Sequence, residues 1–286
     1  MTEQKRKFIS IILLSFVLSL SNIAVTAQPV TLKGKVVSLA PNVTEILYEL
    51  GLGDRVAAVS AYCNYPPEVV EKPKIGGMSN PSLEAIVALK PDMVVLTDDG
   101  NPRIIAERLI QLKIPVHVFR AKRLADLPDA IRALGAALGA KDRADQSARK
   151  IERAINQHNE TFYHGPPKPK HKVLFVLQPE PLMVAGPGTA IDDVLTLLGL
   201  ENIAADAPTA YPRFSLEEVI RRKPDVLFVV RSRDGMGDRT APLLERLKHL
   251  EAVRRGRVCY VSDPLLRMGP RLIQGIDEIA RHLEAI

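Results

Sequence analysis

The sequence predicts an α/β fold of two parallel-sheet lobes joined by one long helix. A string of the form Ser-Leu-Glu…Lys-Pro-Asp occupies residues 82–94 and returns at 215–227. Short apolar runs alternate with helical stretches before and after residues 141–163, which have the pattern of a single polar helix. Two matching units separated by a helix indicate two similar lobes, and we expect a ligand cleft between them.

The N-terminus is typical of an export signal. Lys5, Arg6 and Lys7 form a basic region, residues 8–20 form an apolar stretch, and Ala27 ends a small-residue cleavage site. The apolar stretch is shorter than the roughly 20 residues that a transmembrane helix needs, although an uncleaved anchor is the alternative. The position directly after the cleavage site is not a Cys, so no lipid anchor is expected there. We expect residues 1–27 to be removed and the mature chain to be extracytoplasmic.

In the first half, β-branched apolar runs alternate with helical stretches. The expected strands are 35–39, 56–60, 93–97 and 116–119. The expected helices are 43–50, 82–89, 101–112 and 124–138. Ser82 is the expected N-cap of the second helix, and Gly139 ends the last. Uniformly apolar strands separated by helices predict a Rossmann-like parallel sheet covered by helices.

One long helix and a second lobe follow. Residues 141–163 place Ala144, Ala148, Ile151 and Ile155 on one apolar stripe, and the Gly-Pro-Pro at 165–167 ends the helix. The strands expected after it are 172–177, 182–185, 226–230 and 258–261. The helices expected after it are 189–198, 215–222, 240–247 and 270–285. The predicted organisation is a signal peptide at 1–27, an N-terminal lobe at 28–140, a connecting helix at 141–164 and a C-terminal lobe at 165–286.

Composition and motifs argue against several classes of site. The chain is mildly basic, with a net charge of +6, and its Lys/Arg clusters lack interleaved aromatic residues, so nucleic acid is not an expected partner. Cys63 and Cys259 fall in different lobes, where a disulfide would clamp the cleft, and we expect two separate thiols. The histidines form no pair with metal-ligand spacing, and no nucleophile elbow or phosphate loop appears. No metal site and no catalytic residues are therefore predicted.

Three strings together resemble a known family. They are Val-Val-Ser-Leu-Ala-Pro-Asn-Val-Thr-Glu at 36–45, Tyr-Cys-Asn-Tyr-Pro-Pro-Glu at 62–68, and the doubled Ser-Leu-Glu…Lys-Pro-Asp. In this order they resemble the periplasmic substrate-binding proteins of ABC importers for cobalamin, haem and iron–siderophores, and most closely the cobalamin-binding members. The resemblance covers about residues 34–286. It implies a periplasmic monomer that binds a small molecule and docks on a permease dimer in the inner membrane.

Each copy of the repeat offers one acidic residue, Glu84 or Glu217, just after a Ser cap. A carboxylate there stabilises a helix start by about 0.3–1 kcal/mol, and Ser215 with Glu218 makes a capping-box pattern. A purely structural role is therefore one interpretation. The resemblance implies another, in which Glu84 and Glu217 dock against arginines of the permease dimer.

The ligand is expected at the carboxyl ends of the strands. The candidate ligand-binding residues of the two lobes are Pro41, Tyr62, Asn64, Tyr65, Met78, Asp98, Gln178, Tyr211, Arg213, Asp263 and Arg267. By the resemblance, Tyr62, Tyr211, Asp263 and Arg267 match cleft positions of cobalamin binders. Aromatic rings can cover the flat face of a corrin or porphyrin, and Arg and Asn suit its amide or carboxylate fringe. Structural alternatives are that the tyrosines of 62–65 pack on the Pro-Pro turn, that Asp99 serves only a turn, and that Arg267 pairs with Asp263.

The predicted function is that of a substrate-binding protein that captures cobalamin or a related corrinoid for an ABC importer. The chain contains no Trp, which cobalamin binders commonly use to wall the pocket. The alternative keeps the transport role and changes the cargo to haem or an iron–siderophore. A secreted α/β enzyme, with Asp98, Asp99 or Asp263 as acid or base, is a third hypothesis, against which the missing catalytic motif counts. No resident cofactor is expected, because the metal-centred tetrapyrrole or chelate is cargo.

Overall fold

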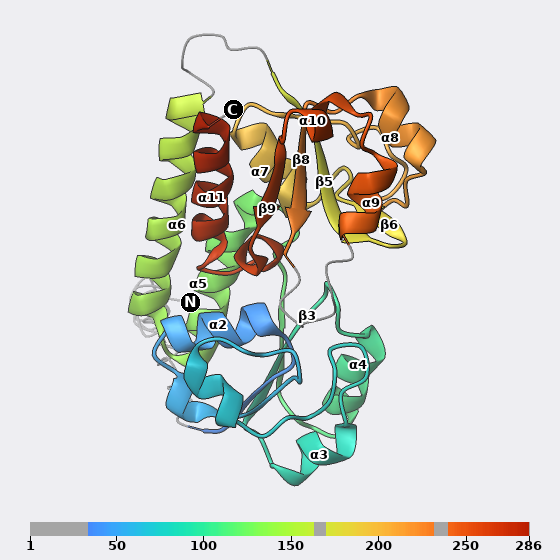
Figure 1. Ribbon diagram of the computed structural model, residues 1–286. Helices are drawn as coiled ribbons and strands as arrows, with labels where there is room; N and C mark the ends of the chain where they lie inside the picture. Colours follow the sequence, from blue (N-terminus) through green and yellow to red (C-terminus); the bar gives the residue numbers. More distant parts are fainter. Residues whose placement is uncertain (1–33, 163–169, 232–239, 286) are drawn as a thin grey trace, which may run out of the picture. The chain divides into compact units, whose positions relative to one another are not determined.

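Two β-sheets organise the computed structural model, which describes residues 34–162, 170–231 and 240–285 (Figure 1). The predicted signal peptide lies outside the described residues. The first sheet has the order β2(Val56–Val59), β1(Val36–Ser38), β3(Met93–Thr97), β4(Val116–Phe119). The second has the order β6(Leu182–Val184), β5(Lys172–Pro179), β8(Val226–Val230), β9(Val258–Val261), and β7(Glu201–Asn202) also pairs with β5. All of these pairings are parallel except that of β5 with β6.

Helices follow the strands in both lobes. The N-terminal lobe contains α2(Pro41–Glu49), α3(Leu83–Ala88), α4(Arg103–Gln111) and α5(Leu127–Leu138), with 3-10 turns η1(Gly53–Arg55), η2(Pro67–Glu71) and η3(Leu124–Asp126). The C-terminal lobe contains α7(Ala190–Leu197), α8(Leu216–Arg222), α9(Thr240–Arg246), α10(Glu251–Arg254), η4(Asp263–Leu266) and α11(Leu272–Glu284). The predicted fold class, two parallel-sheet lobes with one long helix, is confirmed.

The long helix α6(Lys141–Phe162) contacts helices of both lobes: α5 of the N-terminal lobe, and α7 and α11 of the C-terminal lobe (Figure 1). Its predicted stripe is buried at Ala144, Ala148 and Ile151. The approach of α5 is close, because a Cβ on Gly135 would stand 2.2 Å from the Ala144 Cβ. One hydrophobic cluster therefore continues from the first sheet to Phe228 and the second sheet.

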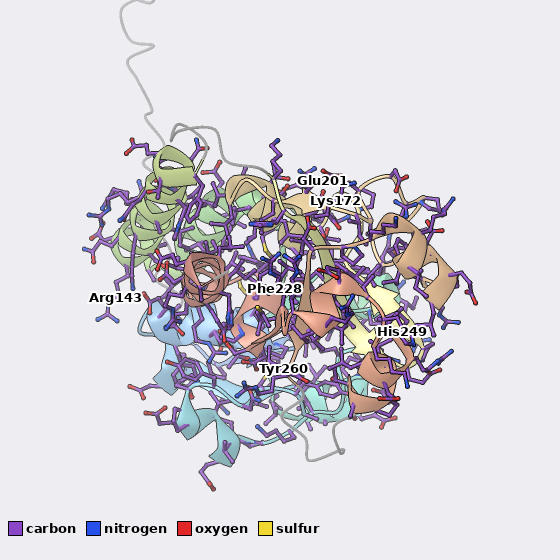
Figure 2. The ribbon with its side chains drawn as sticks, turned by 45° about the horizontal axis from the view of Figure 1, so that its top comes forward. Arg143, Lys172, Glu201, Phe228, His249 and Tyr260 are labelled. Carbon is purple, nitrogen blue, oxygen red and sulfur yellow. The ribbon has the colours of Figure 1, made fainter. Side chains whose placement is uncertain are left out.

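Figure 2 shows the resulting distribution of side chains. Phe228 lies in the interior, with its ring centroid 6.3 Å from that of Phe175, whereas Arg143, Glu201 and His249 lie at the periphery. Buried β-branched and aromatic residues on both faces of each central strand explain why these strands carry helices on both sides.

The repeated Lys-Pro-Asp performs the same structural task in each lobe. Asp92 Oδ2 accepts a hydrogen bond of 2.6 Å from the backbone N–H of Lys35, and Asp225 Oδ2 accepts one of 2.8 Å from the backbone N–H of Lys172. The lysine before each proline is left-handed, with φ of 47° and 49°. Each turn thus ties the strand that follows it to the start of the central strand. The Lys-Pro-Asp part of the repeat therefore has a purely structural explanation.

The structure also corrects some predictions. Strand β6 runs antiparallel to β5 rather than parallel, because the short Glu180-Pro181 turn between them reverses the chain. Helix α2 begins at Pro41, earlier than the expected start at 43, since proline suits the first helical position. The short elements β7 and α10 were not predicted. The two cysteines are free and buried, as expected.

Candidate ligand-binding site

Asn101 holds three strand-end loops of the N-terminal lobe together. This side chain is 7% exposed. Its Oδ1 accepts from the backbone N–H of Thr97 at 2.9 Å, and its Nδ2 donates to the carbonyl oxygens of Leu39 at 3.1 Å and Met78 at 2.8 Å. Leu39 follows β1, Met78 lies in the long loop after β2, and Thr97 ends β3. The candidate residues Met78 and Asp98 are therefore carried on loops with one common anchor.

Three tyrosines supply exposed aromatic surface. Among the residues that the structure describes, the large aromatic side chains that are exposed are Tyr62 at 63%, Tyr65 at 39% and Tyr211 at 45%. All three are predicted ligand-binding residues, and they come from both lobes. The ring of Tyr62 lies against a later part of the same loop, because a Cβ on Gly77 would be 3.4 Å from Tyr62 Cε2.

The loop after β3 acts electrostatically on the C-terminal lobe. Burial of its hydroxyl raises the pKa of Tyr211, and the charge of Asp99 raises it further. The backbone N–H of Asp99 donates to Thr97 Oγ1 at 3.3 Å, which agrees with the predicted turn. Asp99 therefore serves the turn, and its charge also acts on Tyr211, a role that its turn sequence did not indicate.

The other candidates have varied surroundings. Asp98 is exposed, with one carboxylate oxygen 3.7 Å from Lys122 Nζ. Pro41 is buried as the first residue of α2, and Met78 is half-buried. Gln178 is half-buried and donates to the carbonyl oxygen of Glu180 at 2.8 Å. Arg213 is exposed and its backbone bridges to Met183.

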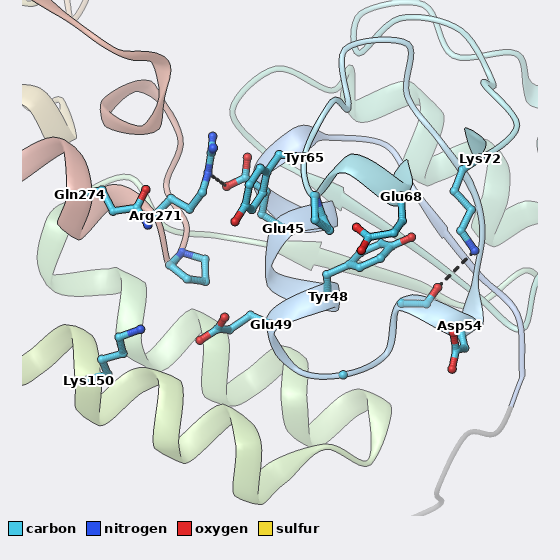
Figure 3. Close-up of a pocket in the computed structure, with 14 residues that line it drawn as sticks. Glu45, Tyr48, Glu49, Asp54, Tyr65, Glu68, Lys72, Lys150, Arg271 and Gln274 are labelled. Atoms are coloured by element: carbon cyan, nitrogen blue, oxygen red, sulfur yellow. Dashed lines mark hydrogen bonds and ion pairs between the residues drawn. The ribbon is translucent and has the colours of Figure 1, made fainter. Parts of the chain in front are cut away.

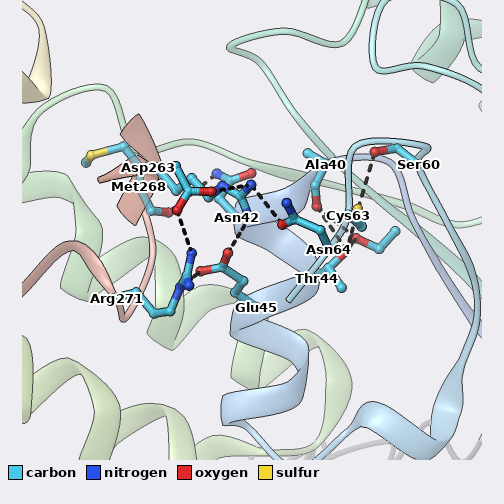
Figure 4. Close-up of polar contacts among 12 residues, drawn as sticks. Ala40, Asn42, Thr44, Glu45, Ser60, Cys63, Asn64, Asp263, Met268 and Arg271 are labelled. Carbon is cyan, nitrogen blue, oxygen red and sulfur yellow. Dashed lines mark hydrogen bonds and ion pairs between the residues drawn. The ribbon is translucent and has the colours of Figure 1, made fainter. Parts of the chain in front are cut away.

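A buried network of charges joins the lobes at the strand ends (Figure 4). Arg267 Nη1 lies 2.6 Å from Glu45 Oε1, and its Nη2 lies 2.9 Å from Asp263 Oδ2. Arg271 Nε lies 3.0 Å from Glu45 Oε2, and its Nη2 lies 3.4 Å from Asp263 Oδ1. We call these four residues the charge quartet. The structural alternative for Arg267, a pair with Asp263, is thus present in the structure.

Two residues of the loop after β2 extend the quartet. Arg267 Nη2 donates to Asn64 Oδ1 at 3.0 Å, and the guanidinium of Arg271 stands 4.0 Å from the ring centroid of Tyr65. Glu45 and Arg271 were not predicted as site residues. A signal existed for Glu45, which stands between the apolar residues Val43 and Ile46 of α2 and is buried there.

A cavity of about 570 Å³ borders the quartet (Figure 3). It is lined by Glu45 and Arg271, and also by Tyr48, Tyr65 and Glu68. Burial raises the pKa of Tyr48, with smaller contributions from the charges of Glu68 and Asp54. One face of the network therefore meets this cavity.

A second ionic contact joins the lobes on the side of α7. Arg123 Nε lies 2.9 and 2.8 Å from the two carboxylate oxygens of Asp193. The backbone N–H of Leu124 donates to the same carboxylate at 2.8 Å. The lobes thus meet through charges at two places as well as through α6.

Glu84 on α3 and Glu217 on α8 are both exposed. The serines before them cap the helices: Ser82 Oγ accepts from Ala85 N–H at 3.1 Å and Ser215 Oγ from Glu218 N–H at 3.2 Å. Only half of the predicted capping box forms, because the Glu218 carboxylate pairs with neighbouring arginines. Hydrogen bonds to its own backbone N–H and to Ser215 lower the pKa of Glu217.

Two features are absent from the described residues. None of their helices is long and apolar enough to cross a membrane. Within the same ranges, no group of three or more His, Cys, Asp or Glu side chains is arranged to hold a metal ion. Cys63, which the sequence placed in the loop after β2, is buried with its Sγ 3.1 Å from Thr44 Oγ1.

Comparison with known proteins gives a family and several relatives. Residues 36–265 match the family described as periplasmic binding protein. The vitamin B12-binding protein of Pectobacterium carotovorum is 30% identical, with 95% of this chain and 96% of the relative covered. That of Vibrio parahaemolyticus is 31% identical, with 93% and 94% covered. A substrate-binding lipoprotein of an uncharacterised ABC transporter from Bacillus subtilis is 31% identical, with 90% and 82% covered.

Solved structures give the same fold. The periplasmic vitamin B12-binding protein of Vibrio cholerae superposes with a TM-score of 0.77 at 27% identity, covering 88% of this chain and 96% of that one. A periplasmic haem-binding protein from Roseiflexus sp. RS-1 superposes with a TM-score of 0.78 at 28% identity, covering 87% and 97%.

Proposed function

Since this chain belongs to the periplasmic binding protein family, we propose that it is the substrate-binding protein of an ABC importer and captures cobalamin or a related corrinoid. The relatives named vitamin B12-binding proteins align over nearly the whole chain and support this cargo. The proposed site lies between the lobes, at the carboxyl ends of the two sheets, where open α/β folds bind ligands.

The observation that carries the proposal is the placement of exposed tyrosines. Tyr62 and Tyr65 follow β2 in one lobe, and Tyr211 belongs to the other lobe. Rigid aromatic rings cover a flat macrocycle at a low cost in conformational entropy. In this proposal the three tyrosines wall the pocket, as tryptophan commonly does in the cobalamin binders that the sequence resembles. Asn64 and Arg213 offer hydrogen-bond donors for the polar fringe of the macrocycle.

Haem or an iron–siderophore is the second candidate cargo. The similarity to a haem-binding protein of known structure supports it. A haem iron takes an axial ligand from the protein, and tyrosine is one of the residues that serve. Tyr62 is the most exposed of the three tyrosines and would be the side chain to test in that case.

The cargo is tested by calorimetry of the mature protein with cyanocobalamin, haem and ferric siderophores. We expect cyanocobalamin to bind with a submicromolar Kd and to bind more tightly than the others. Tyr62→Ala and Tyr211→Ala should each weaken binding about 30-fold, because truncating an aromatic residue that becomes buried on binding costs about 2 kcal/mol of binding free energy. Leu112→Ala is the matched control, because Leu112 is equally exposed but precedes β4, at the opposite edge of the sheet. No binding of cyanocobalamin below micromolar would refute the corrinoid assignment.

The permease is the second partner in this proposal. Glu84 and Glu217 stand at equivalent places of the two lobes, each followed one turn later by an exposed aliphatic residue, Val87 or Ile220. A pair of equivalent carboxylates suits a partner with two equivalent cationic subunits, since charged contacts set docking orientation and rate. We expect Glu84→Ala with Glu217→Ala to abolish uptake while ligand affinity stays unchanged. Glu71→Ala, an exposed carboxylate elsewhere on the N-terminal lobe, is the control. Unchanged uptake in the double variant would exclude this docking role.

Export completes the proposal. The basic and apolar segments before residue 28 support cleavage after Ala27 and a periplasmic location. N-terminal sequencing of the protein recovered from the periplasm should begin at Gln28, and recovery of the full-length chain in the membrane fraction would contradict it.

A further inference from the structure

We infer that Glu45 is a positioning residue for the ligand site: its buried carboxylate, carried by the N-terminal lobe, holds Arg267 and Arg271 of the C-terminal lobe in place. Through them it sets the orientation of Arg267 and the separation of the two lobes. The part that concerns ligand affinity rests on the proposed function, whereas the part that concerns lobe separation does not.

The burial of Glu45 leaves its side chain almost no surface for a direct contact with a ligand between the lobes. Its side chain is only 2% exposed. It lies on α2, which begins directly after the end of β1, while Arg267 follows η4 and the end of β9. Both therefore originate at the strand ends where a ligand is expected, but only Arg267 retains exposed surface there. Any effect of Glu45 on binding must be transmitted through the residues that it holds.

The charges of the quartet give Glu45 a special position. Each arginine contacts both carboxylates, so two positive and two negative charges form a closed ring without net charge. Glu45 is the one member from the N-terminal lobe. Without its charge, the one carboxylate of the described residues that still pairs with Arg267 and Arg271 is Asp263, which belongs to their own lobe. The ionic link between the lobes at this place is then lost, and one buried positive charge is left without compensation.

The quartet is also connected to the aromatic loop after β2. Asn64 accepts a hydrogen bond from Arg267, and Tyr65 stacks on Arg271. When the arginines move away from Glu45, these two contacts between the lobes weaken as well. The tyrosine-bearing loop and Arg267 are therefore positioned by one buried carboxylate, and we expect the same residue to control the distance between the lobes.

The first test measures the lobe separation in the ligand-free protein. Spin labels at Val87→Cys and Ile220→Cys place one exposed reporter on each lobe, and the native cysteines are buried. Glu45→Gln keeps the size of the side chain and removes its charge. We expect a longer and broader distance distribution in this variant. Glu49→Gln, an exposed carboxylate on the same helix, is the control and should leave the distribution unchanged. A folded Glu45→Gln protein with the wild-type distribution would overturn the inference.

The second test separates positioning from general stability. Calorimetry with cyanocobalamin should show about tenfold or greater loss of affinity for Glu45→Gln and for Arg267→Gln. The double variant restores the charge balance of the quartet, and so remains folded if Glu45→Gln does not. Because Glu45 acts through Arg267, the double variant should bind no more weakly than Arg267→Gln alone. Additive losses would overturn the positioning role. If the wild-type protein does not bind cyanocobalamin, the proposed cargo fails, and the distance measurement still decides the role of Glu45.

Discussion

The anchor of the strand-end loops permits a quantitative prediction. Asn101→Ala removes one side chain that makes three hydrogen bonds to backbone groups of three different loops. Alanine cannot replace any of them, and the site is too buried for water to reach all three groups freely. We expect this substitution to lower the stability of the protein and to disturb the geometry of the loops that bear Met78 and Asp98.

The magnitude follows from the three bonds. Each hydrogen bond contributes about 1 kcal/mol net, and a buried group left without a partner costs about 1–3 kcal/mol. Asn101→Ala should therefore lower the free energy of unfolding by about 3 kcal/mol. For a domain of this size, about 1 kcal/mol corresponds to about 2–4 °C in Tm, so Tm should fall by about 6–12 °C.

The assay is urea unfolding followed by circular dichroism, with calorimetry for Tm. Asn101→Asp keeps the acceptor for Thr97 but turns its second carboxylate oxygen toward the carbonyl oxygens of Leu39 and Met78, so its loss of stability should be at least as large as that of Asn101→Ala. Asn156→Ala is the matched control on the exposed face of α6 and should change stability by less than about 0.5 kcal/mol. A loss below about 1 kcal/mol for Asn101→Ala would show that the loops do not depend on this anchor.

Three further predictions concern other parts of the chain. Asp225→Ala removes the hydrogen bond to Lys172 and should cost about 1 kcal/mol in urea unfolding; an unchanged midpoint would remove the structural explanation of the repeat. The pKa of Tyr211 is raised above its ordinary value of 10.0, so the neutral form is favoured in the folded state. Its contribution to stability is present below pH 10.0 and is lost as pH rises through the raised pKa. An ultraviolet titration against Tyr211→Phe should show this, and Asp99→Asn should bring the pKa nearer to its ordinary value; no change on that substitution would contradict the proximity of the two loops. Gly135→Ala should destabilise the protein by about 1–3 kcal/mol in thermal unfolding, since its Cβ has no room beside α6; an unchanged Tm would show that the helices can separate without cost.

Regular elements were the most predictable part of the fold. The strands Met93–Thr97, Val116–Phe119, Val226–Val230 and Val258–Val261 have the predicted bounds, because β-branched runs between turn residues carry a local signal. The short β7 carries no such signal. The direction of β6 could have been predicted, because only residues 178–181 separate the two expected strands and a parallel pair needs a much longer connection.

The candidate site divides in the same way. Tyr62 and Tyr65 could be placed on a strand-end loop, because they follow a strand that the sequence shows. Tyr211 was named as a candidate because it precedes the second Ser-Leu-Glu and by the family resemblance. The charge quartet could not, because Glu45 and Arg271 are 226 positions apart and neither belongs to a motif that predicts a contact.

Hydrophobic periodicity and an internal repeat are local properties of the chain, and they were enough to predict the two lobes, the long helix between them and the equivalent carboxylates Glu84 and Glu217. The pairing of charges across the lobes, with Glu45 buried among them, could not be predicted before the chain was seen folded. An ion pair depends on distance and burial, and both are set when the two sheets pack against the same helix.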